Sequence, residues 1–236
     1  MAKAAPLIPH EPWQPDADPL ASVQRFRDTV SQRRSVRHFS SEPVDRAIVE
    51  AIVAAAGSAP SGANKQPWRF VAISDPDLKR RIREAAEAEE RLFYDGRASD
   101  DWLRDLKPLE VGPDKPFLEE APWLVAIFKL MQDDRPDSTG RVYYVNESVG
   151  MAAGLFLAAA QQAGLATLTH TPSPMGFLGE ILERPAYERP VVLIPVGWPA
   201  AQCMVPDIKR KPVDEILVWR EGGGSKTSGS NPNTSS

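Results

Sequence analysis

The sequence is poor in the residues that form disulfides, bind metals and carry out acid–base catalysis. It contains one cysteine, Cys203, and only three histidines, His10, His38 and His170, which lie far apart in the chain. A single cysteine forms neither an internal disulfide nor a cysteine-rich metal site, so the composition suits a reducing cytoplasm and argues against secretion. We expect no metal ion in the functional site.

Long apolar segments and an excess of positive charge are also absent. The most apolar segment, 149–167, includes Gln161 and Gln162 and falls short of the roughly 20 apolar residues that cross a membrane. It is therefore predicted to be a buried helix. The formal net charge of -4 argues against a general nucleic-acid binder, because phosphate-driven affinity needs a basic face. We predict a cytoplasmic protein that binds neither nucleic acid nor membranes.

Common nucleotide-binding motifs are missing as well. No glycine-rich fingerprint follows a predicted strand, and the chain has no phosphate-binding Walker loop and no internal repeat. No side chain here can deliver electrons, so redox chemistry would have to come from a bound cofactor.

What is present is a pattern of interleaved helices and strands. Hydrophobic periodicity and helix start and stop signals predict helices over 20–33, 47–57, 75–94, 143–163 and 175–183, and strands over 69–74, 123–131, 165–170 and 191–198. These elements alternate too irregularly for repeated βαβ units, so we predict an α+β fold.

The pattern also predicts the domain organisation. Residues 1–19 read as an N-terminal arm, 20–219 as one domain and the Gly/Ser/Asn-rich segment 220–236 as a flexible tail. Within the domain, the long polar segment 95–122 is predicted to be an active-site lid. The segment 200–219 has no obvious partner in the chain and resembles an arm that wraps another surface.

Two short stretches are candidates for a cofactor site. The stretch "QRRSVRHF" gathers Arg33, Arg34, Ser35 and Arg37, which either complement the end of a helix as solvated cations or bind a phosphate through guanidinium forks. The stretch "PSGA" at 60–63 is more often a turn when taken alone. Together, the two suit a flat, phosphorylated redox cofactor that approaches the backbone closely.

Four motifs carry a resemblance to a known family. The stretches "RRSVRHFSSEPV", "APSGANKQPWRFV", "NESVGMAAGLFLAAAQQAGLATLTHTP" and "VPDIKRKPVDEI" resemble the FMN-dependent nitroreductase superfamily, and most of all its iodotyrosine deiodinase branch. The similarity runs from about residue 28 to 218. It implies a central, mainly antiparallel sheet flanked by helices, and an intertwined homodimer with FMN at its interface, in which 200–219 is a dimer-exchange arm.

The resemblance implies roles for the residues that bind FMN. Arginines of the first motif would meet the phosphate and the flavin edge, the 60–63 loop would lie along the ring system, and a threonine hydroxyl would meet flavin N5. The residues concerned are Arg33, Arg34, Ser35, Arg37, Pro60, Ser61, Gly62, Ala63, Thr169, Thr171 and Arg210. Thr171 is the best-aligned N5 donor and Thr169 the alternative. His170 interrupts a run that is richer in threonine in relatives; it is either an ordinary strand residue, the reading we favour, or a residue that alters hydrogen bonding to the flavin.

A second set of residues points to the substrate. Glu90 and Tyr94 are spaced i, i+4, so both side chains lie on one face of a helix, and Lys115 follows in the polar segment. Alone, such a pair is usually an ordinary surface feature. In the deiodinase branch, however, the carboxylate holds the substrate ammonium, and the tyrosine and lysine hold its carboxylate.

The function implied is reductive dehalogenation of halogenated tyrosines, with the Ala63 backbone N–H and Thr171 acting closest to the reacting groups. NAD(P)H would supply electrons directly or through a flavin reductase. Two alternatives stay open from the sequence: a broad nitroaromatic or quinone reductase, and a flavin-loaded binding module for halotyrosines.

Overall fold

The structure is a computed structural model that describes residues 6–109 and 111–220. The chain divides into two compact units, 1–205 and 206–236. Residues 1–5 of the predicted arm and 221–236 of the predicted tail lie outside the described residues. The division falls inside the predicted 200–219 arm, because Cys203 and Val205 still pack against the core of the first unit.

A four-stranded antiparallel sheet is the centre of the first unit. Its strands are β1 (Trp68–Ile73), β2 (Trp123–Leu130), β3 (Ala166–Thr167) and β4 (Glu188–Gly197), in the order β1-β2-β4-β3. All three pairings are antiparallel, as predicted. The expected strand 165–170 is regular only over β3, and it continues as a single antiparallel bridge between His170 and Leu193.

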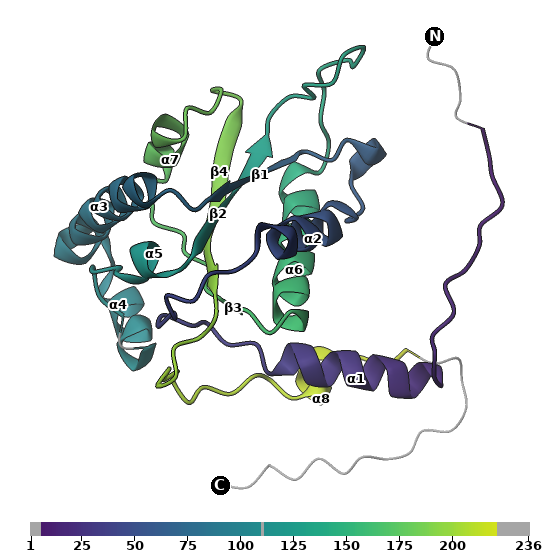
Figure 1. Ribbon diagram of the computed structural model, residues 1–236, viewed down its shortest axis with the longest axis horizontal. Coiled ribbons are helices and arrows are strands. Elements are labelled where there is room, and N and C mark those ends of the chain that lie inside the picture. The colour runs from purple at the N-terminus through teal and green to yellow at the C-terminus, as the bar shows by residue number, and fades with distance from the viewer. Residues whose placement is uncertain (1–5, 110, 221–236) are drawn as a thin grey trace, which may run out of the picture. The chain divides into compact units, whose positions relative to one another are not determined.

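Helices cover both faces of this sheet. Those of the first unit are α1 (Pro19–Ser31), α2 (Arg46–Gly57), η1 (Gly62–Asn64), α3 (Pro76–Leu92), η2 (Phe93–Arg97), α4 (Asp100–Leu106), η3 (Lys107–Leu109), α5 (Phe117–Glu120), α6 (Val145–Gln162) and α7 (Gly176–Ile181). Figure 1 shows α2 and α6 on one face and α3, α5 and α7 on the other. The α+β class and the predicted helices are confirmed to within a few residues.

Strand alternation builds the two cores that these helices cover. In β2, Leu124, Ala126 and Phe128 belong to the core under α3, α5 and α7, whereas Val125 and Ile127 belong to the core under α2 and α6. Successive side chains of a strand point to opposite faces, so a strand covered on both sides is apolar throughout. The sheet is therefore held from both faces.

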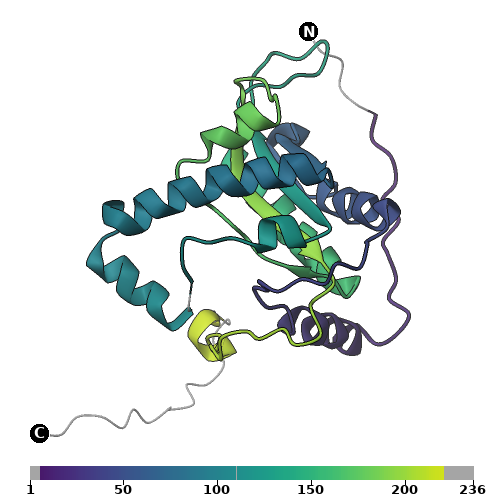
Figure 2. The same cartoon turned by 60° about the vertical axis from the view of Figure 1, so that its left-hand side comes forward.

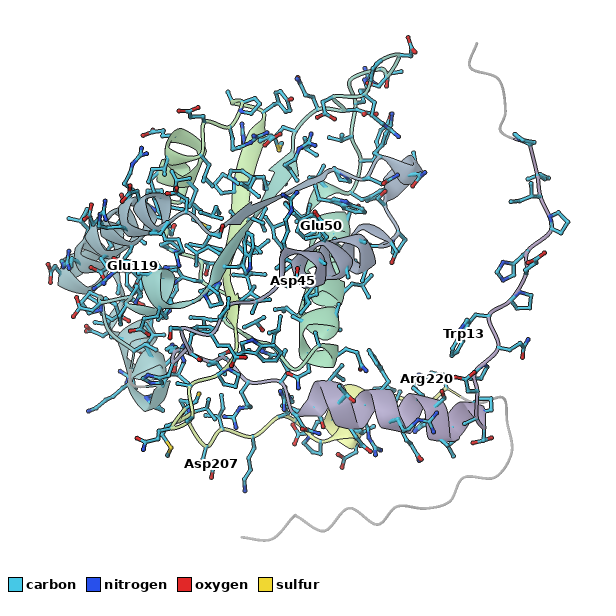
Figure 3. All side chains as sticks on the ribbon, in the orientation of Figure 1. Trp13, Asp45, Glu50, Glu119, Asp207 and Arg220 are labelled. Atoms are coloured by element: carbon cyan, nitrogen blue, oxygen red, sulfur yellow. The ribbon has the colours of Figure 1, made fainter. Side chains whose placement is uncertain are left out.

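Local sequence signals fix where the helices begin. The side chains of Asp18, Asp45 and Asp75 each accept a backbone N–H of the first turn of α1, α2 and α3, and Pro19 and Pro76 stand at the first helical position. Figure 3 shows Asp45 at the start of α2. These caps satisfy N–H groups that would otherwise lack partners.

One feature of the fold differs from the sequence prediction. The end of the predicted lid belongs to the core, since Phe117, Leu118 and Ala121 are buried, so a lid would have to end before α5. The helix predicted over 20–33 forms as α1, and its apolar residues Leu20, Val23 and Phe26 remain more than half exposed.

The second unit is described over 206–220 and contains α8 (Val213–Ile216). Its apolar side chains, including Trp219, are exposed. Across the ranges that the structure describes, none of the helices has both the length and the apolar character needed to cross a membrane.

Candidate active site

The predicted acid, phenol and amine lie together beside the end of α3. Helix α3 continues into the π-helical turn η2, so Glu90 and Tyr94 lie in successive turns. Lys115 returns to them from the other end of the 95–114 segment, and its Nζ lies 3.1 Å from Glu90 Oε2 and 5.9 Å from the centroid of the Tyr94 ring. The Lys115 and Glu90 side chains are only 7% and 15% exposed.

Main-chain carbonyls complete this group. Lys115 Nζ also donates a hydrogen bond to the Gly112 carbonyl, and the Tyr94 hydroxyl donates to the Val111 carbonyl at 3.3 Å. The three side chains are thus partnered within the protein, as a charge pair and a neutral phenol. A ligand with both charges could exchange for these contacts.

Burial and charge set the protonation of the neighbouring groups. Burial and then the Glu90 carboxylate raise the pKa of Tyr94, and the nearby Arg37 guanidinium opposes them. Burial lowers the pKa of Arg37, against the influence of Tyr94, but arginine stays protonated at neutral pH. The site therefore presents a phenol that donates hydrogen bonds and a cation close to it.

The facing wall is the strand extension that carries the threonines. His170 N donates to Leu193 O, and Leu193 N to His170 O, both at 2.9 Å. Thr169 and Thr171 are exposed whereas His170 is 7% exposed, because alternate residues of an extended chain face opposite sides. Both hydroxyls thus remain candidates for the cofactor-facing donor.

His170, between the two threonines, also lines the cavity and is buried against Phe117. Its ring meets Phe117 edge to face, with ring centroids 5.8 Å apart, and its Nε2 is buried without a hydrogen-bond partner among the described residues. Burial, followed by the charges of Lys115 and Arg37, lowers the pKa of His170 to about 3. The imidazole is neutral at physiological pH, and its interpretation as an ordinary strand residue stays a prediction.

A cavity of about 420 Å³ connects the two walls. It is lined by seven predicted residues, Arg37, Glu90, Tyr94, Lys115, Thr169, His170 and Thr171, together with residues that include Phe93, Trp102, Leu106 and Phe117. Figure 2 shows α4 leaving the end of α3 and running back beneath it. The volume is within the range of small-molecule sites, roughly 300–1,000 Å³.

The apolar lining was not predicted from the sequence. Trp102 and Leu106 are an i, i+4 pair on α4. This spacing could have predicted that both side chains lie on one face of a helix. Phe93 contacts Trp102 edge to face, with ring centroids 4.9 Å apart. These side chains give the cavity a face that suits an aromatic ligand.

The 60–63 loop does not line this cavity. Ala63 and Asn64 adopt positive φ values of 50° and 51°, and the Ser61 hydroxyl accepts the Gln66 N–H at 2.8 Å. A Cβ added at Gly62 would lie 2.8 Å from Tyr144 Cδ2. Gly62 is therefore required by packing within its own chain, and its contact with a flavin stays a prediction.

The arginine motif is only partly at the cavity. The Val36 N–H donates to the Thr167 carbonyl at 3.1 Å, which places the motif beside the strand leading to the threonines. Arg37 lines the cavity, whereas Arg33, Arg34 and Ser35 do not. Arg210 belongs to the second unit, and its contact with a cofactor stays a prediction.

Comparison with known proteins identifies the family. Residues 30–198 match the family model described as the nitroreductase family. The chain belongs to this family. The relatives found place it in the iodotyrosine deiodinase branch: it is 51% identical over 200 residues to an iodotyrosine deiodinase of Haliscomenobacter hydrossis, which covers 84% of this chain and 90% of that protein.

Other relatives extend the comparison to animals and to solved structures. The chain is 42% identical over 206 residues to iodotyrosine deiodinase 1 of Homo sapiens, covering 86% of this chain and 71% of that protein. The fold is similar, with a TM-score of 0.69 and 30% identity over 84% of this chain and 99% of the other, to a crystal structure of oxidized iodotyrosine deiodinase bound to FMN and 3-iodo-L-tyrosine. A Bacteroides fragilis nitroreductase with bound FMN, at 19% identity, has the same fold (TM-score 0.61, covering 83% of this chain and 98% of the other).

Proposed function

We propose that this protein is an FMN-dependent reductive dehalogenase of halogenated tyrosines. The observation that carries the proposal is the assembly of Glu90, Tyr94 and Lys115 at one wall of a cavity. An α-amino acid head group bears one positive and one negative charge, and this wall offers one carboxylate, one ammonium and a neutral hydrogen-bond donor. A nitroaromatic or a quinone has no such head group.

The residues present fit FMN. Arg37 supplies a cation to the cavity, and Thr169 and Thr171 are exposed residues that line it. Arginine suits a phosphate because its guanidinium matches the oxygens with parallel hydrogen bonds. Similarity to a deiodinase structure that contains FMN and iodotyrosine supports FMN as the cofactor and a halotyrosine as the substrate of this protein.

Reduced FMN would supply the two electrons that the reaction requires. In balance, a halotyrosine, two electrons and one proton give tyrosine and halide: one carbon–halogen bond breaks and one carbon–hydrogen bond forms. The protein's own residues bind and orient the substrate. Glu90 holds the ammonium, Lys115 and Tyr94 hold the carboxylate, and the aromatic lining excludes water, which strengthens these polar contacts.

We propose that the active form is a homodimer. The loop 60–63, predicted to lie along the flavin, does not line this chain's cavity, so a second copy would bring it to the cofactor. On α6, a Cβ built at Gly150 or Gly154 meets no heavy atom of the described residues within 4 Å apart from the chain neighbours and the nearby backbone of its own helix. This open face and the exposed apolar side chains of 206–219 would pack against the second copy of the chain. The second copy would also bring its Ala63 N–H to the substrate.

Electrons would come from NAD(P)H, either directly or through a flavin reductase, which fits a cytoplasmic location. Steady-state turnover with NADH or NADPH, with and without an added flavin reductase, distinguishes the two routes. Turnover that needs the added reductase supports the indirect route.

The proposed function is tested with purified protein reduced by dithionite under anaerobic conditions. Diiodotyrosine and a nitroaromatic are supplied separately, and halide release and flavin reoxidation are followed for each. We expect rapid, stoichiometric halide loss from diiodotyrosine. Faster reoxidation by the nitroaromatic would identify a nitroreductase instead, and tight binding of diiodotyrosine without halide loss would identify a binding module.

A further inference from the structure

A buried carboxylate behind the head-group wall has no role in the site described so far. Glu87 lies on α3, three residues before Glu90, and its side chain is 8% exposed. It does not line the cavity, although Glu89 and Glu90 do. Glu87 can therefore act on a ligand only through other residues.

Glu87 binds the main chain of Lys115. Its Oε1 accepts the Lys115 backbone N–H at 2.7 Å, a contact between residues 28 positions apart. The Lys115 carbonyl accepts the Leu118 N–H at 3.0 Å, and Leu118 is fully buried. The backbone of Lys115 is thus held from both sides, by α3 and by the core.

Two arginines keep this carboxylate in place. Arg83 Nε lies 2.7 Å from Glu87 Oε1, and an Arg91 guanidinium nitrogen lies 3.2 Å from Oε2. Burial alone raises the pKa of Glu87, but the hydrogen bonds from Arg83 and from the Lys115 N–H, with the charges of Arg83 and Arg91, outweigh it and lower the pKa. An ionised acceptor makes a stronger hydrogen bond than a neutral one.

We propose that Glu87 is a positioning residue for recognition of the amino-acid head group: by fixing the Lys115 backbone, it holds the Lys115 ammonium opposite Glu90. This inference rests on the proposed function. It explains how the Lys115 ammonium is placed accurately although the preceding segment, 95–114, is weakly anchored: its helix α4 has no buried residue.

A purely structural role for Glu87 makes a different prediction. The same network reaches Glu119 through Arg83 at 3.3 Å and Asp114 through Arg91 at 3.4 Å, and Figure 3 shows Glu119 beside α3. If Glu87 only stabilised this corner of the fold, its loss would weaken binding of every ligand in the cavity. A positioning role affects only ligands that carry the head group.

The experiment compares two ligands on the FMN-loaded protein. Iodotyrosine carries the head group and ortho-iodophenol lacks it, and their dissociation constants are measured by isothermal titration calorimetry for wild type, Glu87→Gln and Glu87→Met. The control is Glu84→Gln, which removes the same charge from an exposed position of α3. FMN content and melting temperature are recorded for each variant.

We expect the dissociation constant for iodotyrosine to rise about tenfold or more in Glu87→Met, which removes the acceptor, and at least about threefold in Glu87→Gln, which keeps a neutral one. The constant for ortho-iodophenol should stay within about twofold, and the control should match wild type.

Equal weakening of both ligands, or an unchanged ratio of the two constants, would overturn the role of Glu87. If Glu87→Met does not fold, the ratio in Glu87→Gln decides. A wild-type protein that binds iodotyrosine no better than ortho-iodophenol would instead contradict head-group recognition itself, and with it the proposed function.

Discussion

Replacing Glu90 with Gln should change the affinity for two related ligands in opposite directions. In the free protein, Glu90 and Lys115 face each other at 3.1 Å, an attraction of about 5 kcal/mol at an effective dielectric constant of about 20. A bound zwitterion replaces this pair with two new ones, ammonium to Glu90 and carboxylate to Lys115. The effect of the substitution is therefore a difference between bound and free states, smaller than the direct attraction.

For iodotyrosine, Glu90→Gln removes the acceptor of a charged hydrogen bond. Such bonds contribute about 1.5–3 kcal/mol, so the dissociation constant should rise about 10- to 150-fold. The dissociation constant for iodotyramine, which has the ammonium but no carboxylate, should rise by a similar factor, because the same contact between the ammonium and Glu90 is lost.

Des-amino iodotyrosine, which has the carboxylate but no ammonium, should bind more tightly to the variant. In wild type its carboxylate must separate Lys115 from Glu90 and is then repelled by the Glu90 charge. In Glu90→Gln the repulsion is gone and Lys115 has lost its carboxylate partner, so we expect affinity to improve by about tenfold.

The assay is calorimetric titration of FMN-loaded protein with the three ligands at pH 7, with Glu84→Gln as the charge-matched control. Flavin absorbance before each titration checks that the cofactor is retained. Weakening of des-amino iodotyrosine to the same extent as iodotyrosine would refute the exchange of ion pairs on which the proposed substrate rests.

Three further predictions concern stability. The Glu188 side chain is fully buried and lies 2.7 Å from Arg184 and 3.2 Å from Arg69. Glu188→Ala should lower the free energy of unfolding by about 3–5 kcal/mol, as measured by chemical denaturation. A loss below about 1 kcal/mol would contradict a stabilising role for this ion pair. Burial raises the pKa of Glu188, but hydrogen bonds and charges from Arg184 and Arg69 lower it overall from its ordinary value of 4.5. The stabilisation by the ionised carboxylate is therefore present above about pH 4.5 and is lost as the pH falls through the folded-state pKa. The melting temperature should accordingly fall less steeply with acid in Glu188→Gln than in wild type. Phe156 is fully buried and stacks on Phe70 with ring centroids 6.0 Å apart, so Phe156→Ala should remove about 3–5 kcal/mol from the free energy of unfolding, whereas Phe156→Leu should remove clearly less.

Local signals in the sequence were sufficient for most of the fold. The caps Asp45 and Asp75 and the continuous apolar run of β2 depend on neighbouring residues, and those elements form where the pattern indicates. The pairing of Glu90 with Tyr94 was likewise readable, because helical spacing determines it.

Contacts between distant segments could not be read in the same way. Lys115 meets Glu90 only because the chain leaves α3, passes through α4 and returns, and the resemblance to a family, not any spacing rule, suggested the pair. The contact of Glu87 is with the backbone N–H of Lys115. Every residue except proline has a backbone N–H, so the amino-acid sequence does not indicate which residue donates it.

Packing also changed the meaning of some residues. Gly62 seemed to make room for a ligand, yet the ring of Tyr144 already occupies the space beside it. The spacing of Leu20, Val23 and Phe26 predicted the helix, but burial of that face within a single unit does not follow from periodicity alone, and these side chains remain exposed.

The two walls of the cavity are built from different kinds of structure. Thr169 and Thr171 stand on a chain that is hydrogen-bonded to β4, next to the His170 ring packed on Phe117, whereas Trp102 and Leu106 belong to a helix without a fully buried residue. Segments with few buried contacts open at lower free energy than core strands. Mild denaturant should therefore release the amino acid while the protein is still yellow.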